Sequence, residues 1–247
     1  MKPLLRWVGL VLAATLALQL FFVARIGAMA VFNPESTAFQ RSEAWRLANE
    51  KASFRWRQQW RAYPDISANL KRAVIASEDD GFVSHDGIDW TALEKAWKKN
   101  AQVEAQMNRK AAADAGKGKP TSKAPKVVGG STITQQLAKN LFLSGERTLL
   151  RKGQEMVLTL MLETLLSKQR ILEIYLNSVE WGEGVFGAEA AAQHYFRKSA
   201  AALGPLEAAR LAAMLPRPKY FEKLPHSNYL SERANTLAAR ISSAELP

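Results

Sequence analysis

The chain opens with an apolar run and continues as a series of helix-like segments. From Trp7 to Ala24, 18 residues carry no charge, and only Thr15 and Gln19 are polar. A helix of this length spans roughly 27 Å, close to the hydrocarbon thickness of a bilayer. No face of the run is polar, so a buried core helix fits it less well. The pattern predicts a transmembrane helix within residues 1–30.

The charges that flank this run predict its orientation. Lys2 and Arg6 precede it, and Arg25 is the only basic residue in the fifteen positions that follow Ala24. The positive-inside rule therefore places the N-terminus in the cytoplasm and the rest of the chain outside. A cleaved signal peptide is the alternative, because residues 28–30 read Ala-Met-Ala, but the run exceeds the about 7–15 residues of a signal core. We expect an uncleaved anchor.

Residues 31–62 are expected to form a membrane-proximal stalk. They are rich in aromatic and basic side chains, Trp45, Trp56 and Trp60 among them. Such side chains suit the headgroup region of a membrane, and they suit packing onto a domain equally well.

Residues 63–247 have mainly helical spacing and are expected to form one domain. One helix starts at Pro64-Asp65 and ends near Glu78, and a second starts with Asp89 as its N-cap. The strongest helical patterns cover residues 148–166 and 168–176, with Ser167 as N-cap of the latter. We find no alternating strand pattern and no repeat, so the sequence predicts a mainly α fold with room for one short hairpin.

Charge and composition narrow the function classes. A net charge of +11 calls for an anionic partner, and the apolar N-terminus favours a membrane over nucleic acid. The absence of cysteine excludes disulfides, thiolate catalysis and cysteine-bound zinc. Residues 98–126 read as a basic insertion whose second half is a mobile, solvated loop, because it contains few core-forming residues.

The first candidate for chemistry is Glu78, at the end of its predicted helix. The negative end of the helix dipole and the neighbouring charges of Asp79 and Asp80 raise the pKa of such a carboxyl, as suits a general base. An acidic triplet in isolation is more often a solvated helix end. Phe82 and His85 follow within one turn, and we interpret His85 as a residue that positions this loop.

A second polar block, residues 129–136, reads Gly-Gly-Ser-Thr-Ile-Thr-Gln-Gln. A glycine turn that leads into a helix exposes backbone N–H groups, and Ser131, Thr132, Gln135 and Gln136 supply neutral donors and acceptors suited to sugars. An ordinary helix cap is the simpler alternative.

A third block carries cations around one carboxylate. Arg147, Arg151 and Glu155 repeat every four residues and share a helix face, with Lys152 beside them and Lys139 nearby. An exposed salt bridge would explain Arg151 and Glu155 alone. Because this block contains several cations and few acids that could pair with them, a bound diphosphate explains it better than a salt bridge does.

Taken in order, the blocks resemble the peptidoglycan glycosyltransferases (glycosyltransferase family 51), and within them the monofunctional transglycosylases. The resemblance covers residues 63–221 and rests on Glu78-Asp-Asp-Gly-Phe-Val-Ser-His-Asp-Gly, residues 129–136, Arg151-Lys-Gly-Gln-Glu155 and Lys168-Gln-Arg-Ile-Leu-Glu-Ile-Tyr-Leu-Asn177. It implies a lysozyme-like, two-lobed helical domain with its site in a cleft. The nearest match to a further family motif, at Arg233, is degenerate.

The resemblance also implies roles. Glu78 would be the general base and Glu155 a second catalytic carboxylate in the polymerisation of lipid II, with inversion and release of undecaprenyl diphosphate. The residues expected to bind or position substrate are Asp79, Phe82, His85, Gly130, Ser131, Thr132, Gln135, Gln136, Lys139, Arg147, Arg151, Lys152 and Asn177.

The expected partners are lipid II, the lipid-linked growing strand and the bacterial inner membrane, with no nucleic acid; proteins of cell-wall synthesis or division stay open. No organic cofactor is expected, and a divalent metal, Mg²⁺ or Mn²⁺, stays open, since no metal ligands are assigned. A lysozyme-like hydrolase and a non-catalytic glycan-binding scaffold are the alternatives.

Overall fold

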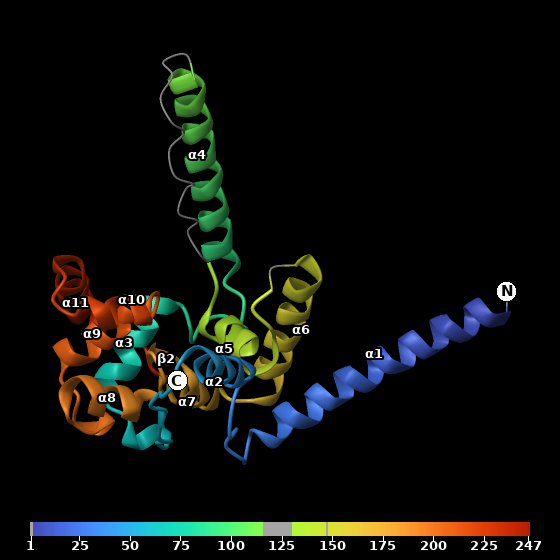
Figure 1. Ribbon diagram of the computed structural model, residues 1–247, viewed down its shortest axis with the longest axis horizontal. Helices are drawn as coiled ribbons and strands as arrows, with labels where there is room; N and C mark the ends of the chain where they lie inside the picture. Colours follow the sequence, from blue (N-terminus) through green and yellow to red (C-terminus); the bar gives the residue numbers. More distant parts are fainter. Residues whose placement is uncertain (1, 116–129, 147) are drawn as a thin grey trace.

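The computed structural model describes residues 2–115, 130–146 and 148–247 and is mainly α-helical (Figure 1). The α-helices are α1 (Lys2–Ala28), α2 (Ala38–Glu50), α3 (Ala68–Glu78), α4 (Trp90–Ala115), α5 (Ile133–Phe142), α6 (Leu149–Leu165), α7 (Lys168–Ser178), α8 (Ala188–Phe196), α9 (Pro205–Met214), α10 (Pro218–Lys223) and α11 (Asn228–Arg240). Three 3₁₀ turns are η1 (Tyr63–Asp65), η2 (Ala200–Ala202) and η3 (Ile241–Ser243). The predicted fold class is confirmed.

Helix α1 is long and apolar enough to cross a membrane, and it extends away from the other helices (Figure 1). Its large apolar side chains are mostly exposed, as expected of a helix whose solvent is lipid. Only its end is buried against the domain, through Ile26 and, just beyond the helix, Met29. The predicted apolar N-terminal helix is confirmed.

The segment after α1 is part of the folded domain. Helix α2 packs against α5, with Leu47 fully buried, and its N-cap Thr37 forms a capping box with Gln40. The ring of Trp56 stacks on Phe186 at 4.5 Å between centroids, whereas Trp45 is 74% exposed. Packing onto the domain therefore explains Trp56, whereas the exposed Trp45 is still able to contact a membrane surface.

Two groups of helices make up the domain (Figure 1). On one side α3 packs against α9 and α11, and on the other α5 packs against α6 and α7. One continuous set of buried apolar side chains joins them, with Tyr175 of α7 and Trp181 among the largest. The indole Nε1 of Trp181 donates to the carbonyl of Leu211 at 3.0 Å, so the buried polar atom is satisfied.

A small sheet lies beside this core. Its strand order is β1 (Arg57–Gln58), β3 (Val185–Phe186), β2 (Glu180–Gly182), with β1 parallel and β2 antiparallel to β3. The β2–β3 hairpin turns at Gly184, which has φ +70°; a Cβ there would lie 2.3 Å from the carbonyl oxygen of Arg55. Only glycine fits this close approach.

Helix α4 starts where Asp89 was predicted to cap it: Asp89 Oδ1 accepts a hydrogen bond from Ala92 N at 2.8 Å. It extends out of the domain to Ala115 (Figure 1), so the first part of the basic segment 98–126 is helical. The predicted mobile loop falls mostly on residues 116–129, which lie outside the described residues.

Candidate active site

Glu78 is the last residue of α3, and it is half-buried. The helix begins at Ser67, whose hydroxyl accepts from Leu70 N at 3.1 Å, and its apolar face is buried in the core. Glu78 Oε2 accepts from Gln136 Nε2 at 3.0 Å, and Oε1 accepts from Ser77 at 3.3 Å. Burial raises the pKa of Glu78, and Asp79 adds a smaller rise, while the hydrogen bonds and the positive charge of Arg233 oppose it. The carboxyl is therefore tuned as a proton acceptor chiefly by lost solvation.

The buried Tyr175 of α7 fixes the orientation of Gln136. Its hydroxyl donates to Gln136 Oε1 at 2.9 Å, and burial raises the pKa of Tyr175 well above its usual value, so the phenol keeps its proton. Because the amide oxygen is occupied in this way, the NH₂ group must face Glu78. Three helices thus hold one proton acceptor in place.

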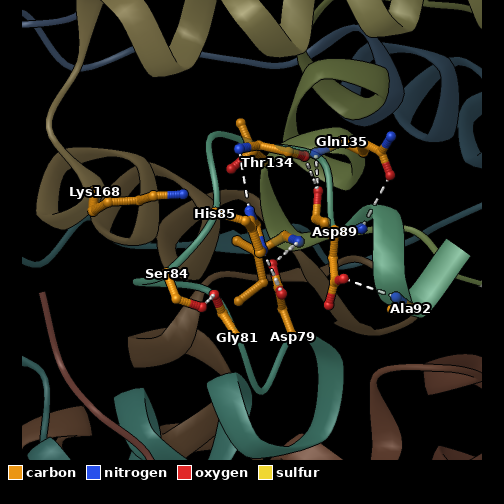
Figure 2. A network of polar contacts seen from close by, with 12 residues as sticks. Asp79, Gly81, Ser84, His85, Asp89, Ala92, Thr134, Gln135 and Lys168 are labelled. Carbon is orange, nitrogen blue, oxygen red and sulfur yellow. Dashed lines mark hydrogen bonds and ion pairs between the residues drawn. The ribbon is translucent and has the colours of Figure 1, made fainter.

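Asp79, Phe82 and His85 shape the loop after α3. His85 Nδ1 accepts from Gly87 N at 3.1 Å, so Nε2 carries the proton and donates to Asp79 Oδ1 at 2.8 Å. Asp79 Oδ2 accepts from Ile133 N at 2.9 Å, at the start of α5. Figure 2 shows Asp79 and His85 side by side, with Thr134 and Gln135 of α5 nearby.

Of the predicted substrate contacts in this loop, Asp79 and Phe82 are buried: Phe82 is fully enclosed and packs against the His85 ring. Their hydrogen bonds and packing fix the loop after α3, and their contact with substrate stays a prediction.

The glycine block begins α5 with a capping box. Thr132 Oγ1 accepts from Gln135 N, and Gln135 Oε1 accepts from Thr132 N, both at 3.1 Å. Thr132 Oγ1 also donates to the carbonyl of Gly87 at 2.6 Å, which ties α5 to the loop after Glu78. The simpler cap interpretation holds for Thr132, and Gly130 packs closely against α4. Ser131 remains exposed.

Glu155 of α6 is 3% exposed and lies between two cations. Arg151 Nη1 is 2.7 Å from its Oε2, and Lys152 Nζ contacts its Oε1. Burial lowers the pKa of Lys139, and the neighbouring Arg151 and Lys152 lower it further, while Glu155 opposes the shift. Arg147 lies outside the described residues.

The Nε atom of Arg151 is buried and donates no hydrogen bond to any part of the chain that the structure describes. A buried donor without a partner is costly, and an anionic ligand would satisfy it.

A cleft of about 490 Å³ brings seven of the predicted residues together. Its lining includes Ser131, Gln135, Gln136, Lys139, Arg151, Lys152 and Glu155. Glu78 borders it through its hydrogen bond to Gln136. Gln136 thus lies between the carboxylate of Glu78 and the cations that line the cleft.

Asn177 lies away from this surface. It is fully buried; its Oδ1 accepts from Arg61 N and its Nδ2 donates to Arg61 O, each at 2.8 Å. It clamps the segment before η1 to α7, so the structure gives it a structural role in place of the predicted substrate contact.

Sequence reasoning missed Glu180 of β2 and Phe39, which also line the cleft. A charged residue between the apolar Val179 and Trp181 was the available signal at Glu180, and nothing in the sequence marked Phe39.

Within the described residues, no group of three or more His, Asp or Glu side chains could hold a metal ion. Both carboxylate oxygens of Glu155 are engaged by Arg151 and Lys152. The residues present therefore do not fit a divalent metal bound through Glu155.

A mainly helical fold with carboxylates beside a cationic cleft fits an enzyme that transfers sugars. The family model described as transglycosylase matches residues 46–242, and the chain belongs to that family. Its fold is lysozyme-like, and the family predicted from the motifs is confirmed.

Relatives named "Biosynthetic peptidoglycan transglycosylase" match almost the whole chain. The one from Burkholderia thailandensis is 51% identical over 246 residues, which cover 98% of this chain and 88% of the relative. The one from Herminiimonas arsenicoxydans is 50% identical over 248 residues, which cover 100% and 99%. The one from Paraburkholderia phytofirmans is 49% identical over 246 residues, which cover 98% and 94%.

Proposed function

We propose that this protein polymerises lipid II into peptidoglycan glycan strands. The single observation that carries the proposal is the cleft in which Lys139, Arg151 and Lys152 gather beside Gln136, the hydrogen-bond partner of Glu78. Hydrolysis of a neutral glycan would give these cations nothing to neutralise. A diphosphate leaving group needs them.

In the proposed reaction Glu78 takes the proton of the 4-hydroxyl of the acceptor lipid II. The hydroxyl oxygen attacks the anomeric carbon of the lipid-linked strand from the face opposite the leaving group. The bond from that carbon to the diphosphate oxygen breaks, and undecaprenyl diphosphate leaves with the electron pair. The product is a β-1,4 linkage formed with inversion.

The cation cluster stabilises the charge that develops on the leaving oxygens, in place of the general acid of a glycosidase. The role of Glu155 is to hold Arg151 and Lys152 in position, since it contacts both. From the motif match alone, Arg147 would join this cluster.

We also propose that the protein lies in the inner membrane of a bacterium, with its N-terminus in the cytoplasm and its domain outside. The support is α1 together with the basic residues that precede it. Its substrates are lipid-linked, so an anchor confines enzyme and substrate to one surface and raises their effective concentration.

The test is to incubate the full-length, detergent-solubilised protein with lipid II and to separate the products on a gel. We expect a ladder of glycan from the wild type and a loss of at least about a hundredfold in Glu78→Gln, because the amide cannot accept a proton. Asp80→Asn is the matched control: it removes the exposed carboxylate two residues on, paired with Arg240, and should keep the ladder.

Turnover of Glu78→Gln close to that of the wild type would contradict the role of Glu78 as general base. If the protein shortens preformed glycan and forms no ladder from lipid II, it is a hydrolase and not a polymerase.

A further inference from the structure

One carboxylate in the cleft has no part in the mechanism above. Glu180 lies on β2, is 7% exposed, and lines the same cleft as Glu155 and Lys139. Its Oε1 atom is buried and accepts no hydrogen bond from the residues that the structure describes. The nearest cation, Lys219 Nζ, lies 3.3 Å from this atom and also pairs with Glu43, so the buried acceptor is only partly satisfied and a group that binds there would stabilise it.

Three elements surround this carboxylate. Lys219 of α10 places its Nζ 3.3 Å from Glu180 Oε1, but its hydrogen bond goes to Glu43 of α2. Glu43 also pairs with Arg46 at 2.9 Å, so Lys219 and Arg46 share Glu43 as their close partner. Glu180 thus has a cation near it and still has an oxygen to offer.

The surroundings suit a neutral polar group more than a charged one. Burial raises the pKa of Glu180 to about 7; Lys219 and Arg46 oppose this shift, and the charge of Glu43 adds to it. A carboxyl near its pKa both donates and accepts hydrogen bonds. Phe39, Leu215 and Pro218, which line the same cleft, add apolar surface. A sugar ring offers this combination, with apolar ring faces and hydroxyl or amide edges.

We propose that Glu180 and Lys219 form a sugar-binding subsite. It would bind a hydroxyl or acetamido group on the sugar of the substrate whose diphosphate lies against Lys139, Arg151 and Lys152. This subsite rests on the proposed function and deepens it, because it names the part of the substrate that the β2 wall recognises. It also gives the stalk helix α2 a part in the site, since Glu43 holds Lys219.

A purely structural role makes a different prediction. If Glu180 only joined β2 to α10 through Lys219, its removal would lower stability and leave the substrate affinity of the folded protein unchanged. A split between KM and kcat therefore separates the two roles.

The experiment measures lipid II polymerisation by the full-length protein in detergent, with thermal unfolding of each variant in parallel. We expect Glu180→Ala to raise KM about tenfold with kcat within about twofold, the effect of one lost hydrogen bond to substrate. Glu180→Gln keeps a donor and an acceptor and should restore KM to within about threefold. Lys219→Met should raise KM as well, and it replaces the first variant if Glu180→Ala does not fold.

The matched control is Glu183→Ala, in the turn of the same hairpin. Glu183 pairs with Lys51 and is not among the cleft-lining residues, so its KM should stay at the wild-type value. An unchanged KM in folded Glu180→Ala or Lys219→Met, with active wild type, overturns the subsite alone. An inactive wild type overturns the proposed function, and the subsite with it.

Discussion

At the scale of single residues, Glu78 depends on the one amide that hydrogen-bonds it. The bond from Gln136 lowers the pKa of Glu78 against the rise that burial causes. In Gln136→Met the bond is lost, so the pKa of Glu78 rises further. A general base must be ionised, so the acid limb of the kcat/KM profile should move to higher pH. The measurement is the pH profile of polymerisation.

Gln193→Met is the control for this shift, because Gln193 donates to Glu189 on α8 and does not contact Glu78. An acid limb that stays in place in Gln136→Met would mean that the amide does not tune the base.

The sequence identified the amides and cations of the cleft and the carboxylate of Glu155, but not how they contact one another. It marked the motif residues because acids, amides and cations stand out at helical spacing. It could not show that Asp79 and His85 satisfy each other inside the loop, nor that Glu78 meets Gln136, 58 positions away. Glu180 was missed because a lone acid in a short apolar stretch carries no periodic signal.

At the scale of elements, the cap of α5 joins two parts of the site. Thr132→Val keeps the side-chain shape but removes the cap to Gln135 N and the bond to the carbonyl of Gly87. Both partners are buried, so we expect a loss of about 2–3 kcal/mol of stability and a lower Tm. Thermal unfolding in detergent measures it.

Thr236→Val on α11 is the matched control, since its exposed hydroxyl bonds only the carbonyl of Glu232 one turn earlier. A similar Tm change in both variants would mean that the α5 cap contributes nothing beyond an ordinary exposed threonine.

Most helix ends followed the local sequence, but the predicted start at Pro64-Asp65 is wrong: those residues belong to η1, and α3 begins at Ala68 after the cap Ser67. Helix α7 begins after the predicted cap, Ser167, whose hydroxyl accepts from Arg170 N at 3.2 Å. The end of helix α4 was harder to predict, because residues 98–126 contain few core-forming residues. Residues 98–115 contain no glycine or proline and are rich in alanine, lysine and glutamine, so helix propensity carries α4 through them.

At the scale of the whole molecule, Arg170 is one of the side chains that join the membrane anchor to the domain, together with Gln19, which hydrogen-bonds Gln154, and Phe22, which packs on Phe142. Arg170 of α7 donates from Nε to the carbonyl of Met29 at 2.8 Å, and from Nη2 to the carbonyl of Phe32 at 3.0 Å and to Asn33 Oδ1 at 2.8 Å. Its guanidinium also pairs with Glu173 at 2.9 Å. The sequence predicted both the anchor and α7, but contacts between residues about 140 positions apart have no local signature.

Because Arg170 fixes the chain where it leaves α1, it should set the position of the cleft relative to the bilayer. In Arg170→Ala the chain after α1 loses these hydrogen bonds, so we expect the domain to be held less firmly relative to the anchor. We expect lipid II polymerisation in vesicles to fall about fivefold, whereas in detergent micelles, where substrate approaches from any side, it should fall less than about twofold. Arg41→Ala is the control, since Arg41 is exposed and bonds only Ser36. An equal loss in vesicles and micelles would assign Arg170 to the stability of the domain and not to the placement of its cleft.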